Sequence, residues 1–295
     1  MKKQYNMNTR YLTIVAILLS LFSCTEEIDI PLDSTYARLV VEGAITTDTT
    51  IHNVKLTKSG DALMKDLYQP ISDAIVKISD GTNEFILQEN IDNKGVYETE
   101  PTVYGVPGRT YTLNISNVDI DDDGVFEVYT AESELRGENP IDSIKFVYDD
   151  SNPDYGGWMV NMYAKEIGGG RNFYLMKAYI NDVLVTDSTH EYGYIGDNTG
   201  FNGKYFDGFQ VYMLNKKKKD EIVESGDKIT IEMDGINEGY FNFIYDFIQE
   251  YNPKIPIFSG PSANISTNIV PKDKAVGFFA AYSVVRCSGI VSFKK

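Results

Sequence analysis

Three aspartates at alternate positions form the sharpest chemical pattern in this sequence. Asp119, Asp121 and Asp123 are followed by Gly124, the order of residues that opens a calcium-binding loop. Ca²⁺ is a hard cation that takes several oxygen ligands at once, and glycine at the sixth position allows the chain to turn sharply. The spacing therefore predicts a structural calcium site.

The rest of this segment departs from the calcium-loop pattern, so a plain solvent-exposed hairpin turn is the alternative. Thr130 stands at the twelfth position, where a bidentate glutamate normally completes the shell of ligands. Glu127 or Glu132 would have to take its place. The segment also lies between two predicted strands, whereas a calcium loop of this type joins two helices.

A second group of residues has the chemistry of a binding site. The stretch from residue 192 to residue 209 combines aromatic rings with amides and carboxylates. The rings that we predict to contact a ligand are Tyr192, Tyr194, Phe201, Tyr205 and Phe206. Such a set suits a sugar or a peptide, because stacking contributes contact area at low entropic cost. The alternative is that the rings only attach a long loop, predicted from Gly193 to Gly208, to the underlying sheet.

None of the common catalytic motifs is present in the sequence. Gly-x-Ser-x-Gly and His-Glu-x-x-His are missing, and the glycine run 168–170 lacks the spacing and the Lys-Ser/Thr pair of a phosphate-binding loop. We therefore predict that the protein is not an enzyme and needs no cofactor apart from structural calcium. The alternative is a surface hydrolase of glycans or peptides, since 43 acidic residues can easily supply a carboxylate pair.

Cys24 ends a short N-terminal apolar segment and predicts where the protein resides. Three basic residues precede an apolar run from Tyr11 to Phe22, and Leu21-Phe22-Ser23-Cys24 has the form of a bacterial lipoprotein cleavage site. We expect a signal peptide over residues 1–23, a palmitate-type anchor on Cys24 and a tether over residues 24–36. The apolar run is shorter than the roughly 20 residues of a transmembrane helix. An ordinary secretory signal and a buried amphipathic helix are the alternatives.

The charge of the chain argues against nucleic acid as a partner. Residues 1–23 hold three basic and no acidic residues, so their removal would take the net charge from −16 to about −19. Such an acidic protein repels phosphate backbones. The one basic run, Lys216 to Lys219, is followed at once by two acidic residues and is predicted to be a solvated hairpin turn.

Residues 37–134 are predicted to form a first domain, an antiparallel β-sandwich of the immunoglobulin-like or prealbumin-like kind. Short runs in which apolar and polar residues alternate are separated by Gly, Pro, Asn and Asp throughout this region. The turn Asp80-Gly81-Thr82-Asn83 stands between two such runs and predicts a hairpin.

Residues 135–295 are predicted to form a second antiparallel β domain with one helix. Its strands are expected near residues 158–165, 171–180, 210–214, 228–233 and 275–285. The helix is expected near residues 237–251, because Tyr and Phe recur there at three-four spacing after Asn237. The fold class is therefore mainly β.

The first domain resembles the carboxypeptidase regulatory-like β-sandwich. The similarity rests on alternating apolar residues at 74–78, on Asn93-Lys94-Gly95-Val96-Tyr97, and on Gly105-x-x-Gly108-x-x-Tyr111-x-Leu113. Sandwiches of that family usually have no catalytic activity, so the resemblance implies an architecture and no reaction.

Nearly the whole chain beyond Cys24 is similar to a lipoprotein family of Bacteroidota known as domain of unknown function 4249. The matching pieces are Ile28-Asp29-Ile30, residues 39–45, residues 74–78, Ile141-Asp142-Ser143-Ile144, the predicted helix, residues 260–265 and residues 277–283. The acidic patch at residues 25–29 also resembles the tether that directs such lipoproteins to the outer face of the outer membrane. The periplasmic face is the alternative location.

This resemblance implies a role without a known reaction. Members of the family resemble accessory lipoproteins of TonB-dependent outer-membrane transporters. We therefore expect a non-enzymatic binding or accessory protein that is attached to the outer membrane by lipid and contacts such a transporter.

Overall fold

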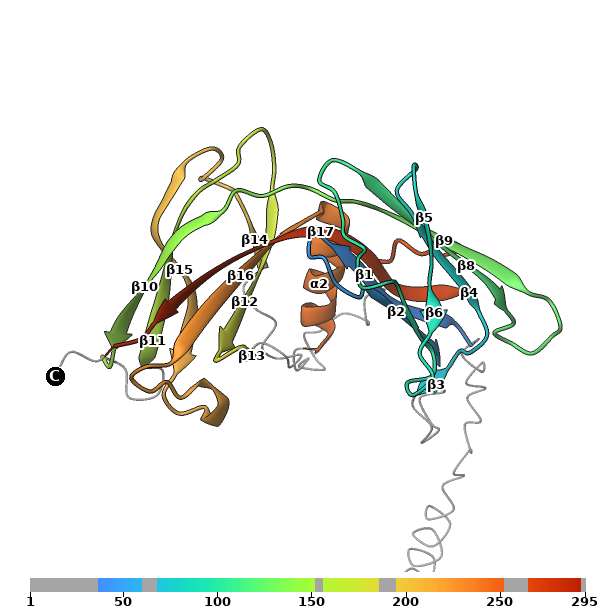
Figure 1. Cartoon of the computed structure of the whole chain (residues 1–295), viewed down its shortest axis with the longest axis horizontal. Coiled ribbons are helices and arrows are strands. Elements are labelled where there is room, and N and C mark those ends of the chain that lie inside the picture. Colours follow the sequence, from blue (N-terminus) through green and yellow to red (C-terminus); the bar gives the residue numbers. More distant parts are fainter. Residues whose placement is uncertain (1–36, 60–67, 152–155, 186–194, 252–264, 293–295) are drawn as a thin grey trace, which may run out of the picture. The chain divides into compact units, whose positions relative to one another are not determined.

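The computed structural model describes residues 37–59, 68–151, 156–185, 195–251 and 265–292. Within them the chain forms several antiparallel sheets and a single α-helix (Figure 1), which confirms the mainly β fold class. The predicted signal peptide, Cys24 and the tether lie outside the described residues, as do Tyr192 and Tyr194.

The largest sheet has ten strands in the order β13-β12-β16-β17-β1-β2-β7-β6, with β14 beside β12 and β3 beside β2. Its strands are β1 (Leu39–Thr46), β2 (Asn53–Ser59), β3 (Tyr68–Pro70), β6 (Gln88–Glu89), β7 (Val96–Glu98), β12 (Phe173–Ile180), β13 (Val183–Leu184), β14 (Ile195–Asp197), β16 (Lys228–Ile236) and β17 (Ala275–Ile290).

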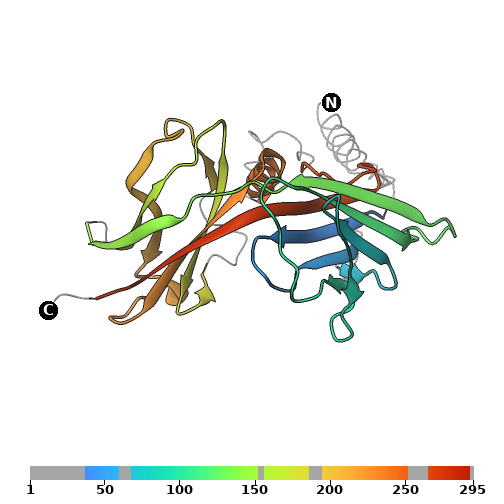
Figure 2. The ribbon, with the colours of Figure 1, turned by 45° about the horizontal axis from the view of Figure 1, so that its top comes forward.

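Strand β17 belongs to both halves of this sheet, and Figure 2 shows it as one continuous red strand. Its first half, from Ala275 to Tyr282, pairs with β1 in parallel, and its second half pairs with β16 antiparallel. The parallel pair is an exception to the antiparallel pattern. Glycine at position 277 allows the close approach of β17 to β1, because a Cβ there would lie 2.0 Å from the carbonyl oxygen of Val41.

A four-stranded sheet packs on the β1–β2–β7 side and forms the first sandwich. Its strands are β4 (Ile75–Ser79), β5 (Glu84–Ile86), β8 (Thr110–Val118) and β9 (Glu127–Glu134), in the order β5-β4-β8-β9. Leu39, Tyr111 and Tyr129 are among the fully buried side chains of its core, and Ile269 and Phe279 join them. The first sandwich thus includes residues that follow the predicted boundary at 134/135, and that boundary stays a prediction.

A three-stranded sheet forms the second sandwich with β12, β16 and the second half of β17. Its strands are β10 (Ile141–Asp149), β11 (Gly157–Lys165) and β15 (Tyr205–Asn215), in the order β10-β11-β15. Apolar side chains at alternate positions, such as Ile229, Ile231 and Met233 of β16, fill its core. A short 3₁₀ helix, η1 (Lys219–Glu221), follows β15.

Helix α2 (Glu238–Tyr251) begins directly after Asn237 and packs on the other face of β12 and β16. The side chain of Asn237 caps it, since its oxygen accepts a 2.9 Å hydrogen bond from the backbone N–H of Tyr240. Ile244 is buried against Phe173 and Ile236. None of the helices in the described residues has the length and apolar character that a bilayer crossing requires.

The prediction of one long loop from Gly193 to Gly208 is wrong. Strand β14 and the start of β15 occupy much of this stretch, with a compact turn over residues 198–204 between them. The polar, glycine-rich composition suggested a loop because the partners of these residues lie elsewhere in the chain, in β11, β12 and the segment that joins them.

Candidate ligand-binding site

The second sandwich contains a cavity of about 350 Å³, which is within the range of small-molecule sites. It lies where β11, β12, β14, β15 and helix α2 meet. The lining residues are mostly apolar: Met162, Tyr174, Met176, Gly196, Asp197, Thr199, Phe201, Phe206, Phe209 and Phe241.

A bulge in β15 brings two of these rings to the same side of the strand. Met162 lies opposite Phe209 and Tyr163 opposite Asp207, so Gly208 is an extra residue in the ladder. In a regular strand Phe206 and Phe209 would face opposite sides, because side chains alternate. Gly208 has a φ of 79°, which favours glycine, so this residue allows the bulge.

Three phenylalanine rings pack against one another in the wall of the cavity. The ring centre of Phe201 lies 5.3 Å from that of Phe206 and 5.6 Å from that of Phe209, and the last two are also 5.6 Å apart. These are normal distances for aromatic pairs. The wall therefore presents ring faces and edges to the cavity, suited to an apolar or aromatic group.

The carboxylate of Glu166, directly after β11, holds the turn that carries Phe201. Its Oε1 accepts hydrogen bonds from Asn172 (2.8 Å), Tyr174 (2.7 Å) and Asn198 (2.9 Å). Its Oε2 accepts from the backbone N–H of Gly168 at 2.8 Å and from that of Gly203. We call these residues the Glu166 network.

Five donors stabilise the charged form of Glu166, although the residue is only 2% exposed. Burial would raise the pKa of this carboxyl. The hydrogen bonds, led by that from Gly203, outweigh burial and lower the pKa to about 2. Glu166 is thus a buried anion at neutral pH around which the turn 198–204 is built.

Glu138 lies near this network and has the opposite shift. Its side chain packs over Gly235 of β16. Burial, together with the negative charge of Glu166, raises the pKa of Glu138 to about 8. Neither glutamate is among the residues that line the cavity. Five donors already occupy the oxygens of Glu166, which suits a structural role.

The residues predicted to bind a ligand divide into three groups. Phe201 and Phe206 line the cavity. Tyr205 does not, because it is 46% exposed and its hydroxyl donates a 2.8 Å hydrogen bond to Asp142. Tyr192 and Tyr194 lie outside the described residues.

The polar side chains expected at the edge of the site mostly form hydrogen bonds and ion pairs with other residues of the protein. Asn198 donates to Glu166 and to the carbonyl of Gly170, and Asp197 accepts from the Arg171 guanidinium at 2.8 Å. The predicted binding stretch 192–209 already included Phe209, which the bulge brings to the cavity. The sequence did not identify Phe241 as a lining residue, because only the placement of helix α2 brings it there.

The sequence pattern also did not indicate a group of buried charged side chains on the face of the sheet that α2 covers. Lys177 Nζ lies 2.8 Å from Glu232 and 2.5 Å from the fully buried Asp234, while Arg286 bonds both Glu232 and Asp48. Burial raises the pKa of Asp234 to about 7, although the Lys177 ammonium opposes the shift. Alternating polar residues in β16 predict a solvated face, so only the packing shows that they are buried. These contacts fix the turn after β1 to β17.

The three aspartates of the predicted calcium site come together in the structure. Asp119, Asp121 and Asp123 each offer a carboxylate oxygen, and these oxygens all lie within 4.8 Å of one another. The segment joins β8 to β9, so it connects two strands as the sequence suggested.

These features define a protein of two β-sandwiches with a shared strand, in which the second sandwich holds a small, mainly apolar cavity. Comparison of the sequence with known families identifies the family: the chain belongs to the one described as Domain of unknown function (DUF4249), whose model matches residues 25–288. This match confirms the predicted family membership. No protein among the curated sequences matches the chain.

Proposed function

We propose that this protein is an outer-membrane lipoprotein that binds a small ligand in the aromatic cavity and assists a TonB-dependent transporter without catalysing a reaction. The observation that carries the proposal is the cavity, whose wall of Phe201, Phe206 and Phe209 offers apolar contact. The nearby polar groups are mostly committed to internal bonds. Binding would therefore depend on shape and stacking.

Two resemblances in the sequence support the location and the absence of catalysis. The lipobox ending at Cys24 and the acidic residues after it are similar to those of Bacteroidota lipoproteins at the cell surface. The first sandwich resembles the carboxypeptidase regulatory-like domain, which is usually non-catalytic. The charge of about −19 after removal of residues 1–23 suits a soluble body held at a membrane surface.

The cavity is tested with a fluorescent apolar probe, 8-anilinonaphthalene-1-sulfonate, on the folded full-length protein in detergent. We expect saturable binding that Phe206→Ala weakens at least tenfold, because this buried ring forms part of the wall. Tyr205→Phe is the matched control, since it changes the neighbouring aromatic residue outside the cavity. Equal affinity in both variants would contradict the proposed site.

The location and the partner need separate measurements. Mass spectrometry of the mature protein should find an acylated cysteine as its first residue, and Cys24→Ala should abolish membrane attachment. Purification from solubilised outer membrane should recover a TonB-dependent barrel in stoichiometric amount. Turnover on a panel of glycans or peptides with no such partner would favour the alternative of a surface hydrolase.

A further inference from the structure

We propose that the turn of residues 119–124, which we call the aspartate turn, binds one calcium ion through Asp119, Asp121 and Asp123. This site belongs to the first sandwich and does not depend on the proposed ligand cavity. Calcium–oxygen bonds are about 2.3–2.6 Å long, so two oxygens on one ion can be separated by up to about 5 Å. The 4.8 Å limit that contains the three carboxylate oxygens is compatible with this spacing.

The strongest support comes from Glu127 at the base of the aspartate turn. Glu127 begins β9 and lies opposite Val118, the residue directly before Asp119. Its side chain is only 9% exposed. One oxygen pairs with Lys274 Nζ at 2.5 Å, but the other is buried and has no hydrogen-bond donor among the described residues. Although Lys274 already supplies one positive charge to this carboxylate, a buried oxygen without a donor is costly and indicates that a partner is missing at this end of the sandwich.

Tyr129 adds a second unpartnered polar group under the same turn. It follows Glu127 by two residues on the inward face of β9, is 0% exposed, and its hydroxyl has no hydrogen-bond partner within the part of the chain that the structure describes. Burial, and then the charges of Glu127 and Asp121, raise the pKa of Tyr129. A hydrated cation could supply partners to both groups.

Backbone N–H groups stabilise part of the charge of the turn, since Asp119 accepts hydrogen bonds from Asp123 (3.2 Å) and Gly124 (2.9 Å) and Asp123 accepts one from Val125 (2.7 Å), but few cationic side chains face it. Lys58 pairs with Asp122 at 3.1 Å and Lys274 pairs with Glu127. In the described part of the chain no ion pair reaches the three remaining aspartates. Like charges this close repel one another. One divalent cation would neutralise most of this excess negative charge.

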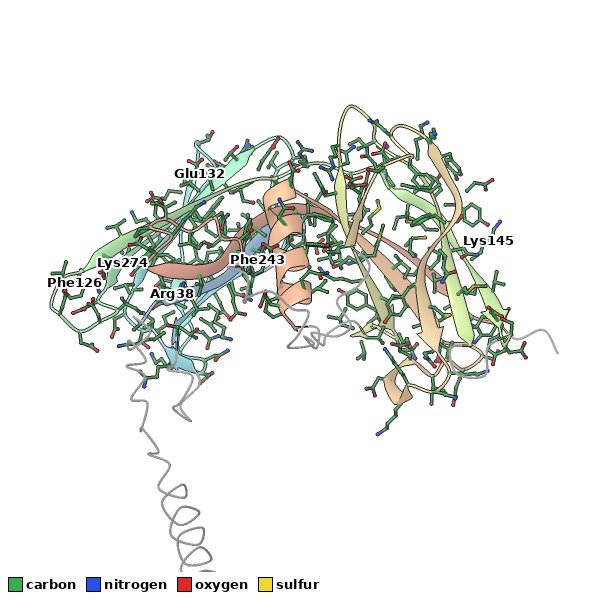
Figure 3. All side chains as sticks on the ribbon, turned by 180° about the vertical axis from the view of Figure 1, so that it is seen from behind. Arg38, Phe126, Glu132, Lys145, Phe243 and Lys274 are labelled. Carbon is green, nitrogen blue, oxygen red and sulfur yellow. The ribbon has the colours of Figure 1, made fainter. Side chains whose placement is uncertain are left out.

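Lys274 lies at the edge of the proposed site and would compete with the ion. Its pKa is raised first by the bond to Glu127 and then by the charges of Asp121 and Asp123. Figure 3 labels Lys274 and Phe126, the second residue after Gly124, at the same end of the first sandwich. A lysine carries one charge and cannot replace three-ligand coordination, but its removal should strengthen calcium binding.

The test is calorimetric titration of CaCl₂ into the chelator-treated full-length protein in detergent, together with melting curves. We expect one saturable site and a rise in Tm. Asp121→Asn should weaken binding at least tenfold and abolish the rise, whereas Asp122→Asn should keep both. The two variants remove the same charge from the same turn, but Asp122 points to Lys58 and is not one of the three ligands.

Further variants and a second ion make the test decisive. Glu127→Gln should weaken calcium binding and Lys274→Met should strengthen it. Equal losses in Asp121→Asn and Asp122→Asn would indicate diffuse attraction of cations and would overturn the proposal. So would an equal response to MgCl₂, or the absence of a saturable signal and of any change in Tm at millimolar CaCl₂.

Discussion

The Glu166 network and the aspartate turn stabilise negative charge to different extents. Glu166 is buried and receives five hydrogen bonds from its own chain. The aspartate turn brings three carboxylates together at the surface, and beside it a buried oxygen of Glu127 has no donor among the residues that the structure describes. In the first region the protein itself stabilises the anion completely. In the second, three backbone N–H groups stabilise Asp119 and Asp123, and within the described ranges none donates to Asp121, so an external cation is the proposed complement.

Glu138 shows that burial alone does not decide between these outcomes. It lies close to Glu166, yet its pKa is raised to about 8 while that of Glu166 is lowered to about 2. Both groups are desolvated, and the difference lies in the donors that face Glu166 and in the negative charge of Glu166 beside Glu138. Counting donors and neighbouring charges around each carboxylate is therefore the useful comparison.

Replacing Glu166 should give the largest effect on stability. Glu166→Gln places an amide where five donors converge, so we expect the free energy of unfolding to fall by about 3 kcal/mol. Urea unfolding measures this difference. Glu134→Gln is the control, because this glutamate is exposed and forms only a 3.6 Å pair with Arg136; it should change stability by less than about 0.5 kcal/mol.

Acid should remove the same contribution from the wild type. Because the pKa of Glu166 is lowered in the folded state, its contribution is present above the unfolded value near 4.5 and is lost as the pH falls towards 2. The loss should be about 3 kcal/mol. Asp80, whose pKa is also about 2, titrates in the same window. The measurement is therefore the difference between wild type and Glu166→Gln, which should shrink steadily below pH 4.5.

Glu138 should produce the reverse dependence at high pH. Because the pKa of Glu138 is raised in the folded state, its contribution to the free energy of unfolding is complete below about pH 4.5 and is lost as the pH rises through about 8. Glu138→Gln should therefore be more stable than the wild type at pH 9, by about 2 kcal/mol, and equal to it near pH 4. Urea unfolding at the two pH values checks this. An equal difference at both would show that Glu138 does not titrate in this range.

Neutralising the aspartate turn should have the smallest effect, and one of opposite sign to that of Glu166. Without calcium, Asp121→Asn should raise Tm by about 1 °C, because it relieves repulsion among exposed carboxylates. With calcium, the order should invert and the wild type should melt higher. A fall in Tm without calcium would show that the hydrogen bonds within the turn already outweigh the repulsion among its carboxylates.

Local patterns predicted much of this fold because neighbouring residues decide it. Turn residues at 80–83 predicted the hairpin between β4 and β5, and the three-four spacing after Asn237 predicted helix α2. The three aspartates were found for the same reason, since one tight turn holds all of them. The loop prediction for residues 193–208 was wrong because the structure of this stretch depends on contacts with Glu166 and with β12, which are distant in the sequence.

The sequence by itself determined the alternation of strands, the helix, the family and the spacing of the aspartates, because these depend on residues close together in the chain. Only the tertiary structure decided that β17 joins both sandwiches, that Gly208 turns Phe209 towards Phe206, and that Glu166 receives its donors. These features require contacts between distant segments. Their energies depend on burial and on hydrogen-bond geometry, and neither is fixed until the chain has packed.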